Sequence, residues 1–138
     1  MYKKKIIERN QVQVYDAYDD SAFTEQITDN RCQFLDFTVP IYHLPKYNWI
    51  VSLNVTKHIP KQFDRIFLDN IAFHAQEGVI LGWASQEGSS HNHNQDQSYL
   101  AHQMKLRGLK LNKKLSRDIK EIATFDWLRD NLNIYERI

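Results

Sequence analysis

Short apolar runs and amphipathic stretches alternate along this chain. Residues 12–17 alternate apolar and polar side chains, as a strand exposed on one face does, and residues 33–37 form a second short strand candidate. The run Trp49–Val55 is apolar almost throughout, which favours a strand covered on both faces. Residues 79–84 have the same character and predict another buried strand.

The period changes to three and four residues after Pro60. Apolar residues at that spacing, separated by charged ones, predict an amphipathic helix that closes before Gly78. The polar residues that follow predict a loop over 85–97. The remaining elements predicted along the chain are a helix over 99–107 capped by Gly108, a strand over 109–111, a helix over 113–123 and a final strand over 133–138.

This alternation of strands and helices predicts an α/β fold in a single domain, residues 1–138. The length, 138 residues, and the 42% hydrophobic content suit one compact core. A net charge of +1 gives no nucleic-acid signal. Cys32 is the one cysteine, and we find no signal peptide and no membrane-spanning run, so we expect a cytoplasmic protein.

Polar side chains follow three of the predicted strands. Ligands of doubly wound sheets bind at the carboxyl ends of the strands, where a carboxylate such as Asp19 can accept hydrogen bonds from a ribose. Asp36 and Phe37 occupy the matching place after the second strand. The alternative for Asp19 and Asp36 is a turn with no ligand, which aspartate favours by itself, and the alternative for Phe37 is a place in the core. Residues 54–58 follow the third predicted strand, and Lys57 and His58 among them could act as a base or bind an anion. The alternative is a solvent-exposed loop without a function of this kind.

His91 and His93 project to one side of an extended chain, so a metal site is conceivable together with His102 or Asp96. No cysteine accompanies these histidines. We therefore assign His91 and His93 to a substrate-side loop and predict no metal, while a metal-dependent hydrolase stays open as a third interpretation.

Taken in order, residues 14–20, 31–36, 47–60 and 78–84 and the histidine loop resemble class I S-adenosylmethionine-dependent methyltransferases. The resemblance covers roughly residues 12–138. It implies a Rossmann-like doubly wound sheet, mostly parallel with an antiparallel last strand, that binds S-adenosylmethionine and methylates an unknown acceptor. The residue roles it implies are ribose binding by Asp19, adenine binding by Asp36 and Phe37, and a position facing cofactor and acceptor for Asn54, Lys57 and His58.

The chain departs from this family at its start. Its glycines are Gly78, Gly82, Gly88 and Gly108, so no glycine-rich loop precedes Asp19. We therefore expect an N-terminally truncated domain whose missing first strand leaves an unpaired sheet edge. Asn54 and Lys57 stand where relatives usually have acidic residues. Two interpretations remain: a methyltransferase with weak or absent catalysis, or a non-catalytic interaction module that self-associates through its sheet edge.

Overall fold

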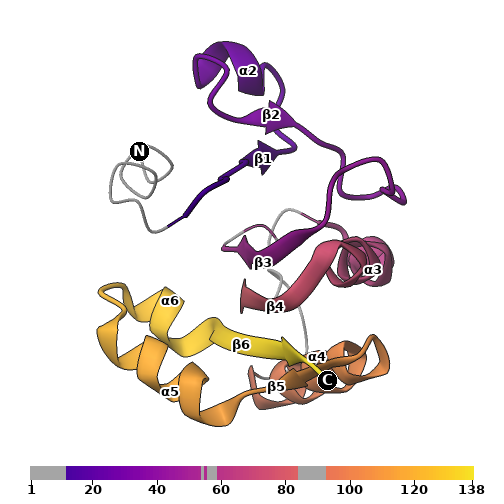
Figure 1. Ribbon diagram of the computed structural model, residues 1–138. Helices are drawn as coiled ribbons and strands as arrows, with labels where there is room; N and C mark the ends of the chain where they lie inside the picture. The colour runs from indigo at the N-terminus through magenta and orange to yellow at the C-terminus, as the bar shows by residue number, and fades with distance from the viewer. Residues whose placement is uncertain (1–11, 54, 56–58, 84–92) are drawn as a thin grey trace. The chain divides into compact units, whose positions relative to one another are not determined.

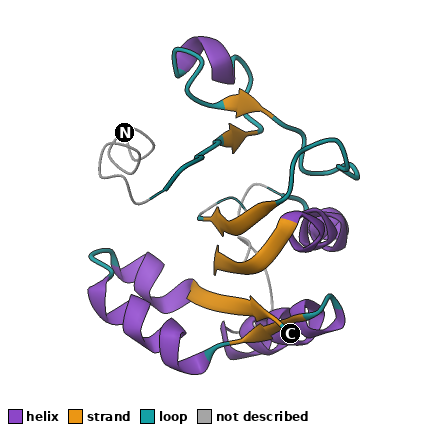
Figure 2. Ribbon diagram, in the orientation of Figure 1, coloured by secondary structure: helices purple, strands orange, loops and turns teal. Residues whose placement is uncertain are grey.

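The computed structural model describes residues 12–53, 55, 59–83 and 93–138. The chain forms two compact units, residues 1–37 and residues 38–138. Figures 1 and 2 show the elements of the two units.

The first unit is built on a short parallel strand pair. Its elements are β1 (Tyr18–Asp19), α2 (Thr24–Ile27) and β2 (Gln33–Phe34). Main-chain hydrogen bonds of 2.9 Å run from Gln33 N to Ala17 O and from Leu35 N to Asp19 O. The strand predicted over 12–17 is therefore wrong in position, because pairing with β2 begins only where that run ends.

The turn between α2 and β2 depends on two short polar residues. Asp29 and Asn30 have φ values of 54° and 58°, a left-handed conformation that such residues tolerate. The Oε1 atom of Glu25 then accepts the Phe34 N–H at 2.9 Å on the side of β2 that faces away from β1. The carboxylate thus occupies the outer edge of β2.

The second unit is organised around a four-stranded mixed sheet of order β3-β4-β6-β5. β3 and β4 are parallel, and β6 is antiparallel to both of its neighbours, as the family resemblance implied for the last strand. The described strand pairs are two parallel and two antiparallel, so the α/β class is confirmed and a mostly parallel arrangement is not. The strands are β3 (Tyr47–Ser52), β4 (Ala75–Gly82), β5 (Leu109–Leu111) and β6 (Leu132–Arg137).

Helices cover both faces of this sheet. In Figure 1, α3 and α4 lie on one face, and α5 and α6 lie on the other, over the β6 side. The helical elements are η2 (Lys61–Phe63), α3 (Asp64–His74), α4 (His93–Leu106), α5 (Lys113–Ile122) and α6 (Asp126–Asn131). The sheet is therefore the middle layer of three.

Several element boundaries differ from the sequence prediction. β4 begins at Ala75, directly after α3 ends, and not at residue 79 as predicted. The sequence did not indicate this early start, because Gln76 and Glu77 are polar, exposed strand residues that interrupt the apolar pattern. α4 begins at His93, inside the predicted loop, and α6 was not predicted. The cap at Gly108 is confirmed, since its φ is 80° and its N–H donates to Lys105 O at 3.1 Å.

Side chains from the sheet and from α3 and α4 form the core. Fully buried members are Leu68, Val79, Leu81, Leu100, Met104, Leu109 and Tyr135. Arg137 joins the ends of both helices to β6, because its guanidinium donates to the carbonyls of Ala72, Ala75 and Arg107 at 2.5–2.8 Å. Buried Asn70 fastens the segment before β3 to α3, bonding Ile41 N at 2.8 Å and Val39 O at 2.9 Å.

Candidate functional site

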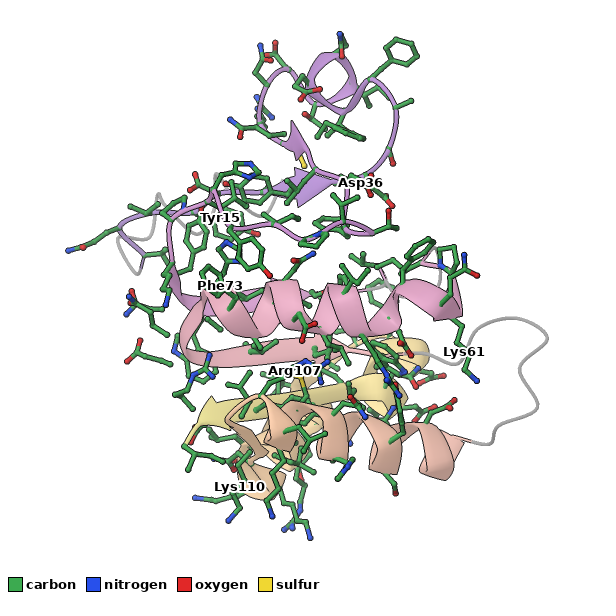
Figure 3. All side chains as sticks on the ribbon, turned by 90° about the vertical axis from the view of Figure 1, so that its right-hand side faces the viewer. Tyr15, Asp36, Lys61, Phe73, Arg107 and Lys110 are labelled. Atoms are coloured by element: carbon green, nitrogen blue, oxygen red, sulfur yellow. The ribbon has the colours of Figure 1, made fainter. Side chains whose placement is uncertain are left out.

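Two exposed carboxylates follow the two parallel strands of the first unit. Asp19 ends β1, and its Oδ1 accepts the main-chain N–H and the hydroxyl of Ser21, each at 3.2 Å. Asp36 follows β2 by two residues and is also exposed (Figure 3). Because the strands are parallel, both acids stand at the carboxyl edge of the pair.

Asp19 is the last residue of β1, and Asp36 lies two residues after β2, while the cofactor-binding role expected for both stays a prediction. Half-buried Phe37 follows Asp36 directly and brings an aromatic ring to the same end of β2. The Ser21 contacts show that Asp19 also forms the local turn that was its alternative interpretation. Turn formation uses Oδ1, so a ligand hydroxyl would be bound through the other carboxylate oxygen.

A third carboxylate of this unit has a structural role. The Phe34 N–H that bonds Glu25 holds the pKa of that carboxyl below its usual value. Glu25 is therefore ionised at neutral pH while it occupies the edge of β2.

The expected catalytic loops lie largely outside the described residues. Asn54, Lys57 and His58 follow β3 and fall outside them, as does His91. His93 is the first residue of α4, and His102 lies exposed further along that helix. Within the ranges the structure describes, no three histidine, cysteine or acidic side chains gather as a metal site.

A polar group that the sequence did not reveal stands at the carboxyl edge of β4. Gln97 in α4 donates to the Trp83 carbonyl at 3.1 Å and accepts from Asn133 Nδ2 at 2.7 Å. The Tyr99 hydroxyl donates to Asp64 Oδ2 at 3.2 Å. These contacts tie the start of α4 to the starts of α3 and β6.

No sequence signal connects these partners. Tyr99 and Asp64 are 35 residues apart, and Asn133 and Gln97 are 36 apart, so only the topology brings them together. All four side chains are half-buried or buried. They join α3, α4 and β6 next to the end of β4.

Three buried polar atoms of the second unit have no hydrogen-bond partner among the described residues. They are Ser52 Oγ at the end of β3, His74 Nε2 at the end of α3, and the Tyr135 hydroxyl in β6. Burial raises the pKa of Tyr135 above its ordinary value, so its phenol stays protonated.

Comparison with known proteins gives one structural match. No protein-family model matches the chain, and no curated protein does. The chain is similar to the crystal structure of magnesium protoporphyrin IX methyltransferase from Synechocystis PCC 6803 with bound SAM, with a TM-score of 0.53 and 15% sequence identity. The match covers 88% of this chain and 58% of that one.

This chain shares its fold with that methyltransferase. At 15% identity the likeness establishes the α/β architecture and leaves the chemistry to the residues themselves. The chain spans little more than half of the matched protein. No helix among the described residues is both long enough and apolar enough to cross a membrane.

Proposed function

We propose that this chain is a methyltransferase-like protein that binds S-adenosylmethionine at the carboxyl edge of β1 and β2. The observation that carries the proposal is the pair Asp19 and Asp36, exposed at the ends of two adjacent parallel strands. The fold is shared with a methyltransferase whose crystal structure holds SAM.

The donors and acceptors of these residues fit a nucleoside. Ribose hydroxyls and the adenine amino group donate hydrogen bonds, and ionised carboxylates accept them. Asp19 would take the ribose hydroxyls, and Asp36 with Phe37 would hold the adenine through a hydrogen bond and ring contact.

When bound, S-adenosylmethionine supplies a methyl group on a sulfonium to a nucleophilic acceptor, a reaction that depends mainly on in-line positioning. We assign the acceptor side to the two segments that follow β3 and β4. They contain Asn54, Lys57 and His58 in the first, and His91 and His93 in the second. The acceptor is unknown, and catalysis by this chain alone is expected to be weak or absent.

Isothermal titration of S-adenosylhomocysteine into the full chain tests the binding proposal. Asp19→Asn keeps an Oδ1 acceptor for Ser21 while removing the charge, so the turn is retained. Loss of one charged hydrogen bond should weaken binding about 10- to 100-fold. Asp29→Asn is the matched control, because asparagine also tolerates the left-handed backbone there. No saturable heat, or equal affinities for both variants, would refute the proposal.

A further inference from the structure

β3 is an edge strand of the four-stranded sheet and lacks the usual protection of such strands. Its six residues, Tyr47–Ser52, include no charged residue and no proline. Exposed strand edges otherwise pair with another chain, and proteins prevent this with charges, prolines or short edges.

Two other sheet edges among the described residues carry such protection. The Glu25 carboxylate accepts a hydrogen bond from the Phe34 N–H at the outer edge of β2. β5 is only three residues long and exposes Lys110 at its centre (Figure 3). The edge of β3 differs from both of these edges, because its residues carry no charge.

An apolar stripe runs along β3. Trp49, Val51 and Leu53 are 40%, 54% and 40% exposed, and their alternate spacing puts them on one face. Val51 pairs with Ile80 of β4, and Ile80 pairs with Ile134 of β6, so these side chains lie on the same face of the sheet. The helices on that face, α5 and α6, lie over β6 rather than over β3 (Figure 1). Among the described residues of the second unit, β3 thus combines exposed apolar side chains with an edge that pairs with no other strand of its sheet.

We propose that β3 pairs with β3 of a second copy of this chain, antiparallel and across a two-fold axis at Ile50. Directly opposite residues of an antiparallel pair point to the same face, so only registers that match residues of the same face are allowed. In the register centred on Ile50, Trp49 stands opposite Val51 of the second copy. The sheet then continues through the axis as eight strands, four from each copy.

This register matches like with like. Asn48 faces Ser52 of the second copy, Trp49 faces Val51, and Ile50 faces itself. Moving the axis to Trp49 would oppose Asn48 and Ile50, and moving it to Val51 would oppose Ile50 and Ser52. Both shifts place a polar side chain against an apolar one, and the register at Ile50 avoids this.

An independent observation on the same strand supports a partner. The Ser52 hydroxyl is buried without a hydrogen-bond partner among the described residues, which is costly. In the register centred on Ile50, the amide of Asn48 from the second copy lies directly across from it. The net charge of +1 also opposes association only weakly. A second copy would therefore supply hydrogen-bond partners both for the main-chain groups at the edge of β3 and for the Ser52 hydroxyl. Because the paired segment is short, we expect a weak, concentration-dependent dimer.

Disulfide trapping tests the register. In a Cys32→Ser background, Ile50→Cys places two thiols opposite each other at the axis, within the distance that a disulfide spans. Mild oxidation should cross-link this variant about tenfold faster than Val51→Cys or Ile122→Cys, because proximity raises the effective thiol concentration. Ile122 is the control, being 77% exposed on α5 and away from β3.

A mixed pair keeps the test valid if Ile50→Cys fails to fold. Asn48→Cys and Ser52→Cys, mixed in equal amounts, should form the heterodimeric disulfide faster than either alone forms a homodimer. Sedimentation equilibrium of the unmodified chain should show a reversible dimer. Equal cross-linking at Val51 and Ile50, or a strict monomer at every concentration, overturns the proposal. Both readouts are independent of cofactor binding, so either proposal can fail alone.

Discussion

Replacing Gly78 with alanine tests how β3, β4 and β6 fit together. A Cβ built on Gly78 would lie 2.6 Å from the Tyr135 carbonyl oxygen and 2.6 Å from Cη2 of the Trp49 ring. Both distances are about 0.8 Å shorter than an ordinary van der Waals contact. The Trp49 ring is 40% exposed, but the Tyr135 carbonyl belongs to the main chain of the neighbouring strand and cannot turn aside. Gly78→Ala therefore acts as an overpacking mutation.

The loss of stability expected for Gly78→Ala can be compared with that of the same substitution at Gly82 in the same strand. Overpacking costs about 1–3 kcal/mol, and two clashes, one with main chain, place Gly78→Ala at the upper end. The lower entropy of the unfolded alanine chain returns about 0.4–1 kcal/mol, leaving a net loss of about 2 kcal/mol. A Cβ on Gly82, in the same strand, meets its nearest atoms at 3.5–3.7 Å, which is ordinary contact. Gly82→Ala should therefore be neutral or stabilise by up to about 1 kcal/mol.

Thermal unfolding followed by circular dichroism measures the difference. Gly78→Ala should lower Tm by about 8 °C, and Gly82→Ala should leave it unchanged or raise it slightly. If the two variants unfolded at the same temperature, the close packing of Trp49 and Tyr135 on Gly78 would be wrong.

Three further changes test other contacts of the second unit. Asn70→Ala leaves the buried Ile41 N–H without its acceptor and should lower the free energy of unfolding by about 2 kcal/mol in urea titrations, whereas no loss would refute the bridge. Arg137→Ala removes donors to three main-chain carbonyls and should cost about 2 kcal/mol, with Arg137→Lys losing less; equal losses would show that the forked geometry is unimportant. Tyr135→Phe removes an orphan hydroxyl and should change stability at neutral pH by less than about 1 kcal/mol. Burial raises the pKa of folded Tyr135, so above pH of about 10 the unfolded chain releases a proton that the folded chain keeps; stability should then fall by about 1.4 kcal/mol per pH unit from this residue, and Tyr135→Phe should lack that component.

The sequence was informative where an element has a clear local pattern of apolar and polar residues. The strand predicted at Trp49–Val55 overlaps β3, and the final strand predicted over 133–138 overlaps β6. The helix predicted over 113–123 corresponds to α5. These elements have local patterns that pairing and packing do not override.

Long-range contacts decided the rest of the fold. The strand predicted over 12–17 has the alternating pattern, yet β1 forms at Tyr18–Asp19 because β2 bonds there. β4 starts early because Gln76 and Glu77 follow neither a buried-strand pattern nor a helical one, and their strand conformation comes from neighbouring pairing.

In the candidate site, too, some features follow from local sequence and others depend on long-range contacts. The positions of Asp19 at the end of β1 and of Asp36 shortly after β2 agree with the strand ends that local sequence indicated, while the cofactor-binding role of both stays a prediction. The contacts of Gln97 and Tyr99 could not be predicted, since their partners come from other elements and carry no motif. The roles of Asn54, Lys57 and His58 remain predictions.

Chemical-shift mapping with S-adenosylhomocysteine tests the central proposal most directly. In amide correlation spectra of the full chain, the proposed cofactor site predicts saturable shifts of Asp19 and Ser21 at the end of β1 and of Asp36 and Phe37 after β2, with no shifts in α5. Shifts confined to other elements, or none at saturating ligand, would contradict the assignment of this edge as the cofactor site.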